Sequence, residues 1–252
     1  MPRQELCEII GNEEIAAGMF SLTVRADRLP EPVPGQFVHI KCQEDMPLRR
    51  PISVCGFRDS SLRMVFEVRG RGTKWLSERR PGEALDILGP LGKGFTADGT
   101  PTLFVGGGIG VPPLLLAAEK CSESYAALGF RSDSASILIP EFEQVCVKTE
   151  IATEDGSFGS RGFVTAAAER ILDGAKIGRI CACGPKVMLK SVVSLADARG
   201  IPCEVSMEER MGCGIGACLV CVCALKSGET KRYAQVCREG PVFKSGEVCW
   251  DD

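Results

Sequence analysis

A cluster of cysteines near the C-terminus limits what this chain can fold into more than any other feature. Five of its fourteen cysteines lie within residues 213–237. Cys213, Cys218 and Cys221 have the spacing C-x4-C-x2-C, which is typical of plant-type 2Fe–2S sites that add a distant fourth thiolate. Glycines let such a loop fold tightly, so that its amides point at the sulfurs. They stand at Gly212, Gly214 and Gly216.

The remaining ligand choices stay open at this point. Cys237 and Cys249 compete as the fourth ligand, and Cys237 is preferred because it is nearer in sequence. Cys223 is a surplus thiol: in an extended segment it would point to the same side as Cys221, so the preference for Cys221 rests on spacing alone. A structural zinc site is the main alternative, but zinc sites usually use paired C-x2-C knuckles.

Charge and hydropathy exclude several classes of partner. The 30 basic and 33 acidic residues give a formal charge of −3 without a long run of one sign, which argues against nucleic acid as a partner. No apolar stretch approaches the roughly 20 residues that span a bilayer. The mixed, charged N-terminus does not resemble a signal peptide, so we expect a cytoplasmic protein. A reducing cytosol makes disulfides improbable for these cysteines and favours a metal or redox role.

Residues 1–98 show short extended runs broken by glycine and proline, which predicts an antiparallel β-barrel. A short helix is expected at Thr73–Arg80. The expected strands are Glu5–Ile10, Met19–Ala26, Gln36–Lys41, Ile52–Phe57, Leu62–Arg69 and Ala84–Leu88.

From residue 99 to 207 the pattern changes to strands that alternate with helices, which predicts a parallel sheet with crossover connections. Residues 208–252 fit neither pattern and read as a glycine- and cysteine-rich segment followed by a short polar hairpin. The expected strands of the middle part are Thr102–Val105, Tyr125–Phe130, Val145–Thr149, Gly178–Cys183 and Pro202–Ser206, and its helices are Pro112–Lys120, Gly162–Leu172 and Pro185–Arg199.

Two motifs in the barrel half favour FAD. The run Arg49-Arg50-Pro51-Ile52-Ser53 opens a strand, where an arginine can pair with a diphosphate and a serine can reach the edge of a flavin ring. The run 67–73 leads into a helix whose first amides can bind a pyrophosphate. The candidate flavin residues are Arg50, Pro51, Ile52, Ser53, Glu67, Val68, Arg69, Gly72 and Thr73.

Two motifs in the middle part favour a nicotinamide nucleotide. Each follows an expected strand and opens a helix, and ligands bind at the carboxyl ends of parallel strands. The first is glycine-rich but lacks the G-x-G-x-x-G fingerprint. Arg131, after the second strand, could meet a 2′-phosphate and so would favour NADP. The candidate nucleotide residues are Gly107, Gly108, Gly110, Cys183, Gly184 and Pro185.

The order of these motifs resembles the ferredoxin–NADP reductase superfamily. The ending is more specific: Met207-Glu-Glu-Arg-Met-Gly-Cys213 and Val236-Cys237-Arg-Glu-Gly-Pro are similar to the electron-transfer subunits of class 1B dihydroorotate dehydrogenases. The resemblance covers essentially the whole chain. One departure is Ile52, which stands where many reductases carry an aromatic residue that stacks on the flavin.

The resemblance implies FAD in the first domain, NAD in the second and a 2Fe–2S cluster on Cys213, Cys218, Cys221 and Cys237. It implies a separate FMN-containing catalytic subunit, in a 2+2 heterotetramer, that oxidises dihydroorotate for pyrimidine biosynthesis. Electrons would travel from it through the cluster and FAD to NAD+. The alternatives are a related subunit that serves ferredoxin or a hydrogenase, and an iron–sulfur or zinc module without enzymatic activity.

Three single residues lie outside these motifs. His39 is the only histidine and lies in a strand-like run, so we expect a structural role; a Rieske-type ligand set is excluded, since it needs two histidines. Trp75 is expected to pack. Trp250 is either an anchor for a partner protein or part of the terminal packing.

Overall fold

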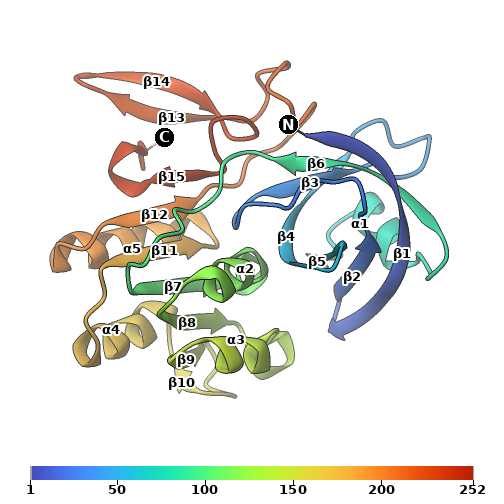
Figure 1. The fold of residues 1–252 in the computed structure, drawn as a ribbon. Coiled ribbons are helices and arrows are strands. Elements are labelled where there is room, and N and C mark those ends of the chain that lie inside the picture. The colour runs from blue at the N-terminus through green and yellow to red at the C-terminus, as the bar shows by residue number, and fades with distance from the viewer. Residues whose placement is uncertain (1, 252) are drawn as a thin grey trace.

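The first part of the protein is a closed antiparallel barrel (Figure 1). The structure, a computed structural model, describes residues 2–251. The strands follow one another around the barrel in the order β1-β2-β5-β4-β3-β6, and β1 closes it by pairing with both β2 and β6. They span β1 (Arg3–Ala16), β2 (Met19–Arg25), β3 (Phe37–Ile40), β4 (Arg50–Arg58), β5 (Ser61–Glu67) and β6 (Ala84–Leu91).

Alternation of side chains along the strands fills the barrel. On β1 the side chains of Cys7 and Ile9 are fully buried, whereas their neighbours in sequence are exposed, as a period of two requires. Leu76 of helix α1 (Arg71–Ser77) is also fully buried and belongs to the same apolar cluster. The barrel predicted from the short extended runs is confirmed, although β1 is much longer than the predicted Glu5–Ile10.

The second part is a mixed sheet with the strand order β10-β9-β8-β7-β11-β12-β15, in which all pairs but the last are parallel. Helices cover both faces. The strands are β7 (Thr102–Gly107), β8 (Ser124–Phe130), β9 (Lys148–Thr153), β10 (Ser160–Arg161), β11 (Arg179–Cys183), β12 (Cys203–Ser206) and β15 (Val242–Lys244), and the helices are α2 (Pro112–Lys120), α3 (Ile139–Val145), α4 (Val164–Gly174) and α5 (Lys186–Arg199).

Successive side chains of the central strand β7 point to opposite faces of the sheet. Leu103 and Val105 pack with α4 and α5, whereas Phe104 between them packs with α2 and α3. A strand buried on both faces has no polar side, which explains its continuous apolar sequence. The predicted parallel sheet is therefore confirmed.

One predicted strand is placed wrongly. Residues Val145–Thr149 were expected to be extended, but helix α3 runs to Val145 and strand β9 begins only at Lys148. The helix has Pro140 in its first turn, where proline is tolerated, and buries Phe142 completely. The β-branched residues between 145 and 149 suggested a strand, but the apolar spacing Ile139, Phe142, Val145 is helical.

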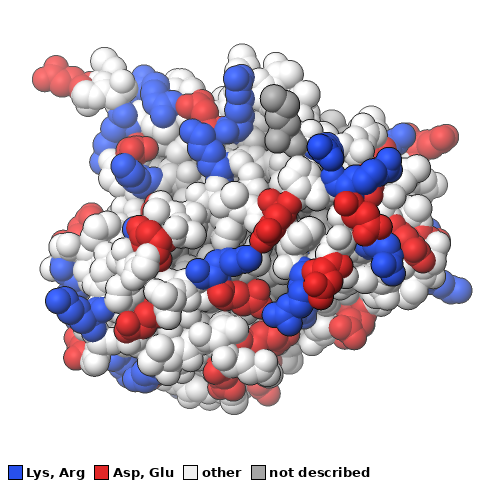
Figure 2. Space-filling view, viewed as in Figure 1, with Lys and Arg blue, Asp and Glu red and all other residues white. Residues whose placement is uncertain are grey.

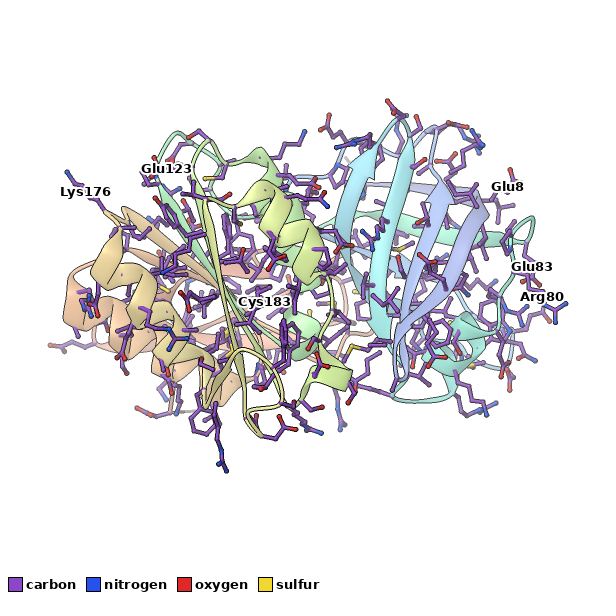
Figure 3. All side chains as sticks on the ribbon, turned by 90° about the horizontal axis from the view of Figure 1, so that it is seen from below. Glu8, Arg80, Glu83, Glu123, Lys176 and Cys183 are labelled. Atoms are coloured by element: carbon purple, nitrogen blue, oxygen red, sulfur yellow. The ribbon has the colours of Figure 1, made fainter. Side chains whose placement is uncertain are left out.

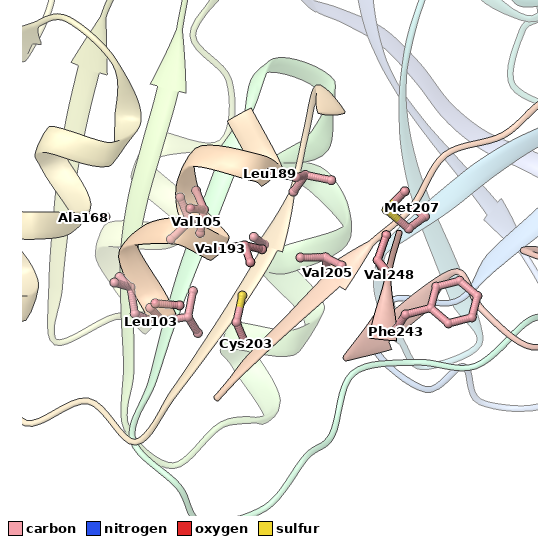
Figure 4. Packing of buried hydrophobic residues seen from close by; sticks show 14 of the residues in the cluster. Leu103, Val105, Ala168, Leu189, Val193, Cys203, Val205, Met207, Phe243 and Val248 are labelled. Atoms are coloured by element: carbon pink, nitrogen blue, oxygen red, sulfur yellow. The ribbon is translucent and has the colours of Figure 1, made fainter. Parts of the chain in front are cut away.

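The cysteine-rich segment is joined to this sheet. Strands β13 (Val222–Ser227) and β14 (Thr230–Gln235) form the expected hairpin, and β15 then pairs antiparallel with β12. Figure 4 shows Phe243 and Val248 beside Val205 and Met207, so the core of the sheet continues into the segment. Strand β15 was not predicted.

The barrel, the sheet and the segment pack against one another. Helix α2 lies against the outer side of β4 and β5, where Cys55 and Val65 join its apolar cluster. Phe37 and Leu91 of the barrel join the cluster that contains the cysteine-rich segment.

Figure 2 shows basic and acidic side chains interspersed on one face, without a continuous basic patch there. Among residues 2–251, no helix combines the length and apolar composition needed to cross a bilayer.

Candidate functional site

The cysteine loop brings four thiols together in two pairs. The Cys213 amide donates to Cys218 Sγ (3.4 Å), and the Ala217 amide donates to Cys213 Sγ (3.2 Å). In the second pair, the Cys237 amide donates to Cys221 Sγ (3.4 Å). No three His, Cys, Asp or Glu side chains of the described residues close around a point for a single metal ion. Two thiol pairs instead suit a binuclear cluster bound by four cysteines.

The electrostatics of the two pairs differ. Burial alone would raise the pKa of Cys213, but the amides of Ile215, Ala217 and Cys218 outweigh it and lower this pKa to about 6. Burial, followed by the hydrogen bond to Cys221, raises the pKa of Cys237 to about 12. Amides directed at a sulfur stabilise the thiolate, which is the form that binds metal. The backbone amides of the loop therefore favour binding of a metal cation on its Cys213 side.

The other two cysteines of the segment take no part in these hydrogen bonds. Cys223 is buried in β13 opposite Ala234, and burial, then Glu209, raises its pKa to about 11. Cys249 lies along the same strand, where its amide donates to the Ala224 carbonyl (3.0 Å). The Cys249 amide thus contacts the chain three residues beyond Cys221, whereas the Cys237 amide contacts Cys221 Sγ itself, so the geometry favours Cys237 over Cys249.

The two flavin motifs are brought into contact at one end of the barrel. The Arg50 guanidinium lies so close to Gly72 that a Cβ there would be 2.0 Å from Arg50 Nε. Thr73 Oγ1 accepts hydrogen bonds from the amides of Arg69 (2.9 Å) and Gly70 (3.2 Å), which fixes the loop before α1. A guanidinium beside such a loop suits a diphosphate.

The other candidate flavin residues lie along the same strands with different exposure. Pro51 is exposed and Ser53 is half-buried, whereas Ile52 is only 8% exposed and belongs to the barrel cluster. Glu67, at the end of β5, pairs with Arg69 at 2.7 Å, and the Val68 amide donates to the Gly18 carbonyl (2.8 Å). A role for Ile52 at a flavin ring remains a prediction.

The two nucleotide motifs lie side by side at the carboxyl edge of the sheet. Strands β7 and β11 are parallel neighbours, with Cys183 opposite Gly106. A Cβ on Gly110 would be 2.4 Å from the Cys183 carbonyl oxygen, and one on Gly107 would be 2.4 Å from Met188 Sδ. Only glycine allows this close approach, so the turn presents bare backbone where a nucleotide can bind. Gly108, Gly184 and Pro185 complete this edge.

Figure 3 places Cys183 near the middle of the molecule, between the helices of the sheet and the barrel. Glu8, Arg80 and Glu83 lie in the same view at the far end of the barrel. Burial raises the pKa of Cys183 to about 12, so its thiol is protonated at neutral pH. A protonated thiol is a poor nucleophile, and the residue therefore contributes shape rather than covalent chemistry.

His39 lies where the barrel meets the cysteine loop, which sequence reasoning did not find. Its side chain is fully buried, and neither ring nitrogen has a hydrogen-bond partner among the described residues. A Cβ on Gly214 would be 2.6 Å from His39 Nδ1. Burial, then the charge of Arg49, lowers the pKa of His39 to about 4, so the imidazole is neutral at pH 7.

Both tryptophans take part in packing. The Arg79 guanidinium carbon lies 4.3 Å from the centre of the Trp75 ring, so the expected packing role is confirmed. The Trp250 indole donates to the Ser245 carbonyl (3.2 Å) and lies against the cluster of the sheet. Arg131 is exposed just beyond the carboxyl end of β8.

Comparison with known proteins agrees with this geometry. Residues 208–249 match the family model described as the iron–sulfur cluster binding domain of dihydroorotate dehydrogenase B. Relatives named "dihydroorotate dehydrogenase B (NAD(+)), electron transfer subunit" are similar over nearly the whole chain. One from Caldanaerobacter subterraneus is 39% identical, over 95% of this chain and 96% of its own. One from a Geobacillus species is 42% identical, over 98% and 99%.

The chain belongs to the electron-transfer subunits of dihydroorotate dehydrogenase B. A solved NADH-dependent reduced ferredoxin–NADP oxidoreductase, described in connection with flavin-based electron bifurcation, superposes with a TM-score of 0.86 at 30% identity. The match covers 98% of this chain and 91% of that one. The predicted resemblance, the fold class and the set of cofactors, FAD, a 2Fe–2S cluster and NAD, are thereby confirmed.

Replacement of single cysteines tests which thiols hold the cluster. Cys237→Ser is expected to lose the cluster, because it removes one member of the Cys221–Cys237 pair, whereas Cys223→Ser and Cys249→Ser keep about two irons per chain. Iron content and the electron paramagnetic resonance of the reduced protein measure the difference. Loss of the cluster in Cys249→Ser with retention in Cys237→Ser would contradict the assignment.

A methyl group at Gly110 tests the nucleotide site. In Gly110→Ala the turn must move away from the Cys183 backbone, and we expect NADH to bind about tenfold more weakly, or about 1.4 kcal/mol. Gly99→Ala is the matched control, since a Cβ there has no atom within 4 Å. Titration of both variants with NADH measures the dissociation constants, and equal values would show that this turn does not bind the nucleotide.

Proposed function

We propose that this chain carries electrons from a dihydroorotate-oxidising, FMN-containing subunit to NAD+. The proposed path passes through a 2Fe–2S cluster on Cys213, Cys218, Cys221 and Cys237 and then through FAD. The observation that supports it most is that the three motifs adjoin. Strand β5, which ends at Glu67 of the flavin motif, contacts the turn Gly108–Gly110, and Pro51 pairs with His39, which lies against the cysteine loop at Gly214. The names of the relatives support NAD+ as the acceptor and dihydroorotate as the source.

In this proposal the protein's own residues hold and orient the groups. Arg50 and the loop that contains Gly72 would bind the FAD diphosphate, and Pro51, Ile52 and Ser53 would line its ring. The turn at Gly107–Gly110 and the edge at Cys183–Pro185 would hold the nicotinamide nucleotide. Bound FAD would supply two-electron exchange with the nucleotide and one-electron exchange with the cluster. The protein would contribute position and potential, and no side chain would act as an acid or base on the substrate.

The exposed part of the cysteine loop would contact the catalytic subunit. Cys218 is exposed, and three apolar side chains beside it are more than half exposed: Ile215 (55%), Leu219 (67%) and Val220 (55%). Apolar side chains gathered on a surface are typical of a protein interface. An electron that leaves the cluster here has the shortest way out of the protein, because the other pair, Cys221 and Cys237, is buried.

We further propose a cytoplasmic 2+2 assembly of the two subunits. All fourteen cysteines are free thiols in the structure, which supports a reducing compartment. The second candidate function is that of a subunit serving ferredoxin, and the similarity to the ferredoxin–NADP oxidoreductase favours it. The two functions share every cofactor and differ in the partner, so turnover with each partner distinguishes them.

The visible spectrum of the anaerobically purified protein, before and after NADH, tests the electron path. We expect stoichiometric FAD and about two irons per chain, with flavin and cluster bands that bleach together. A colourless or zinc-loaded protein, or a flavin that NADH cannot reduce, would contradict electron transfer and favour a binding module without enzymatic activity.

A charge on the cysteine loop tests the interface. Leu219→Asp removes an apolar contact without straining the backbone, because Leu219 has a positive φ of 58° that aspartate tolerates better than leucine. We expect the catalytic subunit to bind at least about tenfold more weakly. Val147→Asp is the control, since Val147 is as exposed (68%) but lies just before β9, outside the cysteine loop.

Calorimetric titration of each variant with the catalytic subunit, at unchanged iron content, measures the affinity. Light scattering of the unmodified complex gives its stoichiometry. Equal affinities for the two variants would show that the partner binds elsewhere.

A further inference from the structure

His39 is a fully buried polar side chain whose ring nitrogens form no hydrogen bond with any described residue. A neutral imidazole carries one N–H donor and one acceptor nitrogen, and both are without a hydrogen-bond partner among residues 2–251. Such buried groups are rare, since leaving one unpaired costs the loss of its hydration. Packing alone would be served better by an apolar side chain of similar size. The burial of a histidine here therefore needs a partner.

The register of the barrel fixes which way the ring points. Val38 and Ile40, on either side of His39, belong to the cluster inside the barrel. Side chains alternate along a strand, so His39 and Phe37 point out of the barrel. Phe37 packs with the cysteine-rich segment, and its ring centre lies 5.8 Å from that of His39.

The ring edge that carries Nδ1 faces the cysteine loop. The three atoms nearest to a Cβ built on Gly214 are Cε1 and Nδ1 of His39, both at 2.6 Å, and Cγ at 3.0 Å. Gly214 directly follows Cys213 and has a positive φ of 73°, so both its conformation and the nearby ring require glycine. The cross-strand neighbours of His39 are Pro51 of the flavin motif and Leu88 of β6, whose side chains offer no acceptor.

We propose that His39 donates its imidazole N–H to a sulfur of the cluster site on the Cys213 side, and that it is a positioning residue that raises the reduction potential of the cluster. Hydrogen bonds to the sulfurs of an iron–sulfur cluster tune its potential, and a donor stabilises the reduced state because that state carries more negative charge. This inference rests on the proposed cluster site.

Isotopic labelling of histidine can test this contact. Because His39 is the only histidine, growth on ¹⁵N-histidine marks this one ring in the full-length chain, provided that the purification tag contains no histidine. Pulsed electron paramagnetic resonance of the reduced, cluster-loaded protein is expected to show an isotropic ¹⁵N coupling. Such a coupling requires orbital contact through a hydrogen bond, so a ring that only packs nearby would not give it.

A potentiometric titration of variants supplies the second measurement. His39→Leu removes the donor and keeps an apolar side chain, and we expect the equilibrium for cluster reduction to fall about tenfold, which is about 59 mV for a one-electron couple. Phe37→Leu is the matched control, since it changes packing on the same face of the same strand but removes no donor.

The outcomes separate this inference from the proposed function. An isotropic nitrogen coupling, with a lower potential in His39→Leu than in Phe37→Leu, supports the inference. An iron-loaded protein without the coupling, equal potentials in the two variants, or a shift of the flavin potential alone would overturn it and leave the proposed function intact. A wild-type chain that binds no iron would overturn the proposed function itself.

Discussion

Strand β15 hydrogen-bonds to the edge of the nucleotide sheet, and the position of the cysteine loop depends on this pairing. Val242, Phe243 and Lys244 lie opposite Ser206, Val205 and Glu204 of β12. The Phe243 and Val248 side chains extend the core of the sheet beneath the hairpin. Just before β15, the Gly240 carbonyl accepts a hydrogen bond from the Lys93 amide, which ties the segment to the end of the barrel after β6. A glycine-rich loop has little core of its own, so these attachments hold it between the two larger parts.

Most of the fold could be predicted because its patterns are local. Alternation specifies the barrel strands, and the change to strands followed by helices marks the sheet. Helix α3 was missed because its few residues lie next to a β-branched run that resembles a strand. Strand β15 was missed because three residues carry no period, and their pairing with β12 is a contact between distant parts of the chain. The boundaries 1–98, 99–207 and 208–252 remain predictions, and β15 shows that the last segment shares its core with the sheet.

The candidate site, too, could be predicted only where its residues lie close together in the sequence. The cysteine spacing is visible in the sequence because three of the four thiols lie in one loop. In the sequence, the preference for Cys237 over Cys249 rests only on distance along the chain. The hydrogen bond from the Cys237 amide to Cys221 Sγ adds a geometric reason for this preference. His39 could not be singled out, since its burial and its neighbour Gly214 depend on how the far end of the chain folds back over β3. A lone histidine in an apolar run is ordinarily a core residue, and only the unsatisfied nitrogens distinguish this one.

The unequal burial of the four thiols has a consequence for how the protein matures. Cys221 and Cys237 lie inside the folded body, where their places are set by packing, whereas Cys213 and Cys218 lie on a loop at the surface. The places of Cys221 and Cys237, two of the proposed ligands, are thus fixed by the packing of barrel, sheet and segment, unlike those in small domains that fold only around their metal. A donor of iron and sulfide would reach the site from the side of Cys218. Because that side also carries the exposed Leu219 and Val220 of the proposed interface, the cluster would have to be inserted before a catalytic subunit covers them.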